Sequence, residues 1–106
     1  MTILQGTTPV LVIPFENTGL DVSDFDAAEL TLKTRVKMVT KTLSQMIVDT
    51  ENNKLSYHFS ETETLNFPYG SLVAWQIFVR IGTEKYGTKE AVFSIDKKTK
   101  GAAMNV

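Results

Sequence analysis

The sequence ETLNFPYGSLVAWQIFVRI, from Glu63 to Ile81, decides the predicted fold. From its tenth residue onwards, apolar side chains alternate between two sides of an extended chain. One side carries Val73, Trp75, Ile77, Val79 and Ile81, and the other carries Leu72, Ala74, Gln76, Phe78 and Arg80. This period of two in β-branched and aromatic residues is typical of a strand with one face in a core. Trp75, the only tryptophan, is predicted to be the central anchor of a β-sandwich.

Other segments carry strand and turn signals that fit the same fold. Thr8–Phe15 is apolar on both faces, so we expect it to be covered on both sides or to lie at a subunit contact. Pro14 marks the end of that strand or an edge of a sheet. Residues 54–60 alternate cleanly, and residues 89–95 are predicted to form a strand that returns from a hairpin loop at 82–87.

The segment from Ala28 to Val36 fits two patterns. As a strand it would turn alternate residues towards the core, namely Ala28, Leu30, Leu32, Thr34 and Val36. As a helix it would begin at Ser23 and present an apolar stripe made of Phe25, Ala28, Leu32, Val36, Val39, Leu43 and Met46. The many threonines and valines favour the strand, because β-branched side chains lose rotamer freedom in helices. One or two further strands are predicted within residues 38–48.

Length and composition limit the classes of protein. The chain has 106 residues and a net charge of −1, and its 42% hydrophobic and 22% charged residues are those of an ordinary globular domain. We expect a β-sandwich domain over residues 1–95 and a short flexible tail over residues 96–106. The near-neutral charge argues against nucleic-acid binding, and the absence of cysteine excludes disulfides and thiolate chemistry. No signal peptide or membrane span is visible, so cytoplasmic synthesis without membrane association is expected.

No catalytic, cofactor or metal site is predicted. His58, the only histidine, lies on the polar side of its strand without partners for a triad or a metal. The acidic group of Asp21, Asp24, Asp26 and Glu29 lacks the spacing of a calcium loop, so a solvated loop is the favoured interpretation. Glu61 and Glu63 resemble a glycosidase pair only in residue type.

Apolar residues that the core does not need are the best candidates for a contact surface. Leu72 and Phe78 lie on the face of their strand opposite Trp75, and Val10 and Val12 belong to the strand that is apolar on both faces. We expect these four residues to contact a partner, most simply a second copy of the chain. The alternative is a carbohydrate-binding module, which would present a flat row of exposed aromatic rings chosen from Tyr57, Tyr69, Trp75, Phe78 and Tyr86.

Several motifs occur together in a pattern known from a family. They are the opening ILQGTTP of residues 3–9, the loop and strand of residues 24–34, the sequence SETETLNF of residues 60–67, Gly70, the WQI of residues 75–77 and a glycine-containing hairpin. Together they resemble the small β-sandwich proteins of phages and prophages of Gram-positive gut bacteria. The chain is also similar to the N-terminal domain of siphophage baseplate upper proteins.

The resemblance implies a non-enzymatic, immunoglobulin-like antiparallel β-sandwich with a structural or assembly role. Proteins of this family assemble with copies of themselves or with other virion proteins, so a place in a tail or baseplate is expected after synthesis in a bacterial host. The chain departs from the family at Ser60–Thr62, where Thr-Gln is usual, and at Lys85–Gly87, which replaces an Asp-Gly hairpin.

Overall fold

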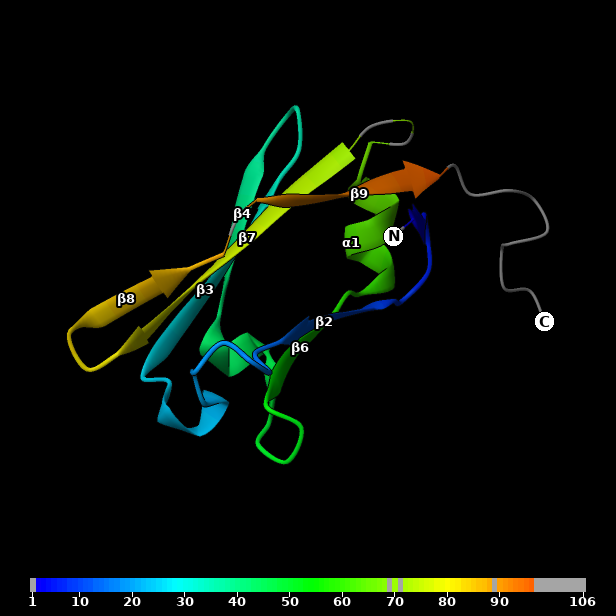
Figure 1. Ribbon diagram of the computed structural model, residues 1–106. Coiled ribbons are helices and arrows are strands. Elements are labelled where there is room, and N and C mark those ends of the chain that lie inside the picture. Colours follow the sequence, from blue (N-terminus) through cyan, green and yellow to red (C-terminus); the bar gives the residue numbers. More distant parts are fainter. Residues whose placement is uncertain (1, 69, 71, 89, 97–106) are drawn as a thin grey trace.

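The computed structural model describes residues 2–68, 70, 72–88 and 90–96. Strands dominate this part of the chain, and the helical segments are short (Figure 1). The strands are β1 (Thr2–Leu4), β2 (Val10–Pro14), β3 (Ala27–Lys33), β4 (Met38–Thr42), β5 (Ile47–Asp49), β6 (Lys54–His58), β7 (Leu72–Ile81), β8 (Glu84–Gly87) and β9 (Ala91–Asp96). The helical segments are the 3₁₀ turns η1 (Val22–Asp24) and η2 (Leu43–Gln45) and the α-helix α1 (Glu61–Asn66).

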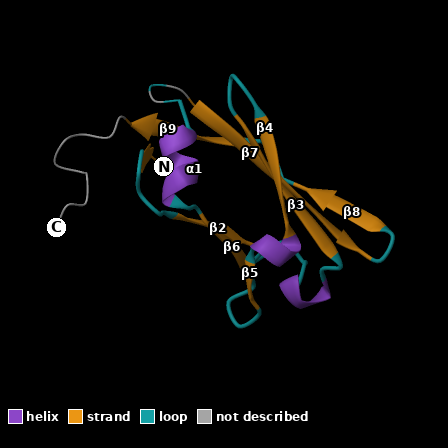
Figure 2. Cartoon of the chain, turned by 180° about the vertical axis from the view of Figure 1, so that it is seen from behind, coloured by secondary structure: helices purple, strands orange, loops and turns teal. Residues whose placement is uncertain are grey.

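The strands form two sheets that pack face to face as a sandwich (Figure 2). The large sheet has the order β1-β9-β7-β3-β4, with β8 paired to β7, and the small sheet has the order β2-β6-β5. The orders β9-β7-β3-β4 and β2-β6-β5 correspond to the G-F-C-C′ and B-E-D strands of an immunoglobulin sandwich. The predicted fold class is therefore confirmed, with one difference: β1 pairs with β9 in parallel, whereas all other described pairs are antiparallel.

The ambiguous segment is a strand, β3, as its β-branched residues predicted. Its alternate residues Ala28, Leu30 and Leu32 are buried, and Thr34 just beyond the strand is buried as well. The prediction that Val36 also faces the core is wrong, because it lies in the turn between β3 and β4 and is 70% exposed. The continuous helical stripe from Phe25 to Met46 does not form.

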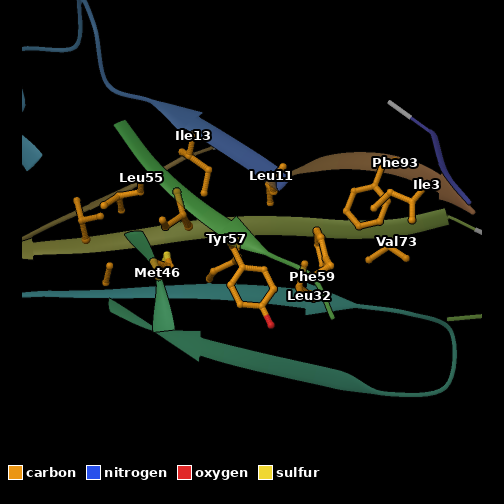
Figure 3. Packing of buried hydrophobic residues seen from close by; sticks show 14 of the residues in the cluster. Ile3, Leu11, Ile13, Leu32, Met46, Leu55, Tyr57, Phe59, Val73 and Phe93 are labelled. Atoms are coloured by element: carbon orange, nitrogen blue, oxygen red, sulfur yellow. The ribbon is translucent and has the colours of Figure 1, made fainter. Parts of the chain in front are cut away.

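An aromatic cluster occupies the centre of the core between the sheets (Figure 3). The Phe59 ring packs edge-on against the rings of Tyr57, Phe67 and Phe93, with centroids 5.0, 5.8 and 5.9 Å away. The aliphatic core residues with at most 1% of their surface exposed are Ile3, Leu30, Leu55, Val73, Ile77 and Ile95. The prediction that Trp75 is the central anchor is wrong: it is only partly buried and packs against the margin of the core.

Strand β1 and helix α1 are among the elements that the sequence analysis did not predict. Strand β1 has only three residues, and its existence depends on pairing with β9, more than ninety positions away. The six-residue helix α1 begins at Ser60, whose hydroxyl accepts from the Glu63 N–H while the Glu63 carboxylate accepts from the Ser60 N–H. This capping box was visible in the sequence as Ser-Glu-Thr-Glu. Inside the helix, the buried Thr64 hydroxyl donates to the Thr7 carbonyl and accepts from the Gly6 N–H, which ties α1 to the segment after β1.

Strands β8 and β9 follow the same edge of β7, one after the other. The predicted loop over residues 82–87 is shorter than expected, because only Gly82 and Thr83 form the turn and the rest is strand β8. Gly82 has a positive φ of 61°, as the first position of a two-residue hairpin turn requires. Between the two strands, the Thr88 N–H donates to the Ile77 carbonyl and the Thr88 hydroxyl accepts from the Ile77 N–H, so the ladder stays satisfied across the break.

The ends of the domain and of its strands agree with most of the expected boundaries. Pro14 is the last residue of β2, an edge strand of the small sheet, as predicted. Strand β9 ends at Asp96, one residue beyond the expected domain boundary. The predicted tail otherwise covers residues 97–106, which lie outside the described part of the chain. None of the described helices is long and apolar enough to cross a membrane.

Candidate protein-contact surfaces

The four predicted contact residues are exposed, but they lie on opposite sides of the sandwich. Leu72 and Phe78 point outward from the large sheet, with 59% and 42% of their surface exposed. Val10 and Val12 point outward from the small sheet on strand β2. One partner surface cannot cover all four at once without wrapping around the domain. The structure therefore divides the predicted surface into two separate candidates.

Leu72 belongs to a larger apolar surface than the sequence indicated. The register of the large sheet places Val92 beside Ala74, Ala74 beside Lys33, and Lys33 beside Met38. Residues adjacent across strands on one face have Cβ atoms about 5 Å apart, so these side chains form a row in which the exposed Lys33 lies between Ala74 and Met38. Val92 and Met38 are 53% and 66% exposed, and Leu72 lies on the same face two residues from Ala74. We call Met38, Ala74, Val92 and Leu72 the outer apolar row.

Phe78 is not part of this row. The neighbouring pair Gln76 and Thr31 adds polar side chains between Ala74 and Phe78 on the outer face. The Phe78 ring lies over Gly87 on β8, where a Cβ atom would be 2.6 Å from the ring carbon Cε1. Phe78 also lines a groove of about 480 Å³ together with Glu29, Arg80 and Lys85. Its surroundings are therefore mixed in charge, and its ring already has an intramolecular partner.

The outer face of the small sheet has its own apolar residues. Val12 lies beside Ser56, and Ser56 lies beside Ile47, so Ser56 is buried although it points away from the core. The face is bordered at one end by the ion pair of Lys54 with Asp49, whose nitrogen and oxygen are 3.9 Å apart. His58 is exposed at the other end, beside Val10. The exposed large apolar residues of this surface are Val10, Val12 and Ile47, each less exposed than Met38 or Leu72 in the outer apolar row.

A partly buried polar cluster joins the two sheets at the β4 edge. The Tyr57 hydroxyl donates to Glu63 Oε2 over 2.6 Å, and Lys41 Nζ lies 3.1 Å from the same oxygen. Lys41 points inward from β4, with its ammonium 5.6 Å from the Tyr57 ring centre, and an inward charge on an edge strand discourages edge-to-edge pairing. In Figure 3 the Tyr57 ring lies in the core and its hydroxyl points out of it.

The cluster shifts two ionisation equilibria. Burial, reinforced by the hydrogen bond to the Glu63 carboxylate, raises the pKa of the Tyr57 hydroxyl above its ordinary value. Burial alone would raise the pKa of Glu63, but hydrogen bonds from Tyr57, the Ser60 N–H and Lys41 outweigh it and lower that pKa. Glu63 is thus held ionised as a structural group that joins α1, β6 and β4.

The acidic residues that resembled a cation site are engaged elsewhere. Asp21 accepts from the N–H and hydroxyl of Ser23, hydrogen bonds that lower the pKa of its carboxyl and hold the turn η1. Asp26 accepts from the Gly82 N–H, which ties the loop before β3 to the β7–β8 turn. Within the described ranges, no three metal-ligating side chains come together.

The aromatic residues do not form a flat row. In the β7–β8 ribbon, Phe78 pairs with Gly87 and Val79 pairs with Tyr86, so Phe78 and Tyr86 lie on opposite faces. Tyr57 is buried and Trp75 is partly buried on the inner side of its sheet. Tyr69 lies outside the described residues.

The sequence matches no protein-family model and no curated protein.

Three residues of the outer apolar row were missed as contact candidates by sequence reasoning, namely Met38, Ala74 and Val92. Val92 had a signal, because it alternates with the inward Ala91 and Phe93. The position of Met38 beside Lys33 depends on where the β3–β4 turn begins, and only the register determines this.

Proposed function

We propose that this chain is a non-enzymatic structural or assembly protein of a phage or prophage, associated with a tail or baseplate and acting through protein–protein contacts. The observation that supports a contact function is the outer apolar row. Its three large members, Met38, Leu72 and Val92, each leave more than half of their surface in water. Covering the exposed part of each would contribute about 1 kcal/mol, so a partner gains most by covering the whole row.

The faces of the sheets suit such a contact better than their edges do. Strand β4 carries the inward Lys41, β2 ends in Pro14, and β1 and β5 have three residues each. Strand β8 has four residues, of which Glu84 and Lys85 are charged. Short or guarded edges are how natural sheets avoid pairing with other chains. The contact is therefore assigned to the outer face of the large sheet. The virion setting is supported by the resemblance of residues 3–95 to phage sandwich proteins.

Purified particles provide the test. After induction of the host, particles are isolated on a density gradient and the chain is detected in them by mass spectrometry. The protein is expected to co-sediment with particles, and Leu72→Glu or Val92→Glu is expected to remain folded but to be lost from them. Thr40→Glu is the matched control, because it adds the same charge to an exposed outer position of the same sheet in the polar row beside Thr31. Particles that never contain the wild-type chain, together with neighbouring genes of no head or tail type, would refute the virion assignment.

A further inference from the structure

The turn between β3 and β4 combines positive charge with exposed apolar side chains. Lys33, Arg35 and Lys37 are exposed and form no ion pair among the described residues. Val36 and Met38, between and beside them, are 70% and 66% exposed.

The turn is also well ordered by hydrogen bonds. The Thr34 hydroxyl accepts from the Val36 and Lys37 N–H groups, and the Thr34 N–H donates to the Lys37 carbonyl over 2.8 Å. A partner therefore meets a preorganised basic turn that borders the outer apolar row.

The opposite end of the molecule carries the opposite charge. Glu16, Asp21, Asp24, Asp49 and Glu51 lie there, with Lys54 paired to Asp49 and with Lys85 beside Phe15 and Leu20. Asn53 holds this end together through its side chain: Oδ1 accepts from the Val22 N–H, and Nδ2 donates to the Phe15 and Leu20 carbonyls. We call these five acids the acidic end. Ile47 and Val48, just before Asp49, add exposed apolar surface to it.

Strand β3 separates the two ends. The loop with η1 leads into β3 at Ala27, and the basic turn follows β3 at Lys33, so a strand of seven residues lies between them. At about 3.3 Å per residue this is roughly 20 Å. Figure 1 shows the β3–β4 connection at the top of the molecule and η1 at the bottom. Two surfaces of opposite charge, each with apolar residues, thus face in opposite directions.

We propose that copies of this chain associate head to tail, with the basic turn of one copy on the acidic end of the next. The proposal rests on the proposed contact function and names the partner as a second copy. A second copy is the partner that charge complementarity favours, because the basic turn and the acidic end carry opposite charges. A contact between two different surfaces does not close after two copies, so it produces a ring or a filament. The average mass should therefore rise past that of a dimer as concentration increases.

Charge reversal at each end tests the proposal. The turn variant is Arg35→Glu with Lys37→Glu, and the end variant is Asp24→Lys with Glu51→Lys. These four side chains are exposed and make no hydrogen bond that holds a turn. Each variant alone is expected to remain monomeric in light scattering at concentrations where the wild type associates. An equimolar mixture should regain association, because the unchanged basic turn of the end variant can bind the unchanged acidic end of the turn variant.

The controls separate charge from shape and from folding. The exchange Arg35→Lys with Lys37→Arg keeps the charge, so it should associate like the wild type. Raising the salt concentration to 1 M should lower the mass of the wild-type assembly, because the Debye length is then about 3 Å and the attraction between the charged surfaces is screened. Circular dichroism should report the same fold for all variants.

Three results would overturn the head-to-tail contact. They are a wild type that stays at 11.8 kDa at every concentration, a turn variant that associates normally, and a mixture that stays monomeric. A different outcome is association that persists in both charge variants and is lost in Leu72→Glu. In that case copies associate through the outer apolar row, so the proposed contact function stands and the head-to-tail arrangement is refuted. If the wild type is monomeric but is recovered in particles, the partner is another virion protein.

Discussion

The two faces of β7 both carry large apolar side chains, and they differ in their surroundings. Val73 and Ile77 on the inner face have at most 1% of their surface exposed, because the small sheet covers them. Leu72 and Phe78 on the outer face are equally apolar and remain in water. Alternation thus assigns residues to faces, but it does not reveal how many faces of the strand are covered. The exposed face of such a strand is where a contact with another molecule should be sought.

The largest expected effect comes from the core side of this comparison. Phe59→Ala removes the ring at the centre of the aromatic cluster and leaves a cavity, so it should lower the free energy of unfolding by about 3–5 kcal/mol. Leu72→Ala on the outer face should change it by no more than about 0.5 kcal/mol. Urea denaturation of both variants measures the contrast. A Leu72 variant as unstable as the Phe59 variant would show that the outer face is structural.

A variant at Trp75 tests how much a partly buried ring of the inner face contributes to stability. Because its ring is only partly buried, Trp75→Ala should lower the free energy of unfolding by about 2 kcal/mol, less than Phe59→Ala. The same urea series gives the ranking. Equal losses for the two variants would restore Trp75 as a central anchor.

The polar cluster at the β4 edge should contribute less, and its contribution should depend on pH. Glu63→Gln removes one charged acceptor from Tyr57, Ser60 and Lys41 and should lower the free energy of unfolding by about 1 kcal/mol at pH 7. The pKa of Glu63 is lowered in the folded state, so its contribution is complete above its unfolded value of about 4.3 and disappears as pH falls through the lower folded value.

The measurement is the difference between wild type and Glu63→Gln in urea denaturation from pH 7 down to pH 3. This difference should shrink below about pH 4.3. Asp21 and Asp49, whose pKa values are also lowered, remain in both proteins and cancel in the comparison. A difference that stays constant over this range would contradict an ionised Glu63 as the stabilising form.

The smallest expected effect concerns the outer face alone. In Gly87→Ala the new methyl group would meet the Phe78 ring, which is exposed enough to swing away, so the loss of stability should be about 0.5 kcal/mol. The chemical shifts of the Phe78 ring should nevertheless change clearly in NMR spectra, with Leu72 unaffected. An unchanged ring would mean that Phe78 does not lie over residue 87.

Local pattern was sufficient for much of the fold. The alternation from Val73 to Ile81 predicted the inward and outward sides of β7, and the threonines and valines in and after β3 favoured a strand over a helix. The outward position of Leu72 and Phe78 followed from the same rule. What local pattern could not supply was every feature that depends on long-range pairing. Strand β1 exists only against β9, and the outer apolar row exists only because the register places Met38, Ala74 and Val92 in one cross-strand line with Lys33.

Residue type was also a poor guide to which aromatic side chain would lie at the centre of the core. Trp75 was expected at the centre because it is the only tryptophan and lies mid-strand on the apolar face. It lies on β7 beside Leu32, near the end of β3, and is only partly buried against the core. The cluster of Phe59, Phe67 and Phe93 brings together three separate segments. Their meeting is a result of topology, and no spacing in the sequence announces it.

The parallel pairing of β1 with β9 has a mechanical consequence. If opposing forces act on the chain at Thr2 and at Asp96, they slide these two strands past each other along their length. The hydrogen bonds between them then carry the load together, whereas a hairpin pulled open at one end breaks its bonds one by one. The domain should therefore resist a force applied between β1 and β9 better than a force that separates β2 from β6. Single-molecule pulling should find a higher rupture force between residues 2 and 96 than between residues 10 and 58, which pair directly in the antiparallel ladder of β2 and β6.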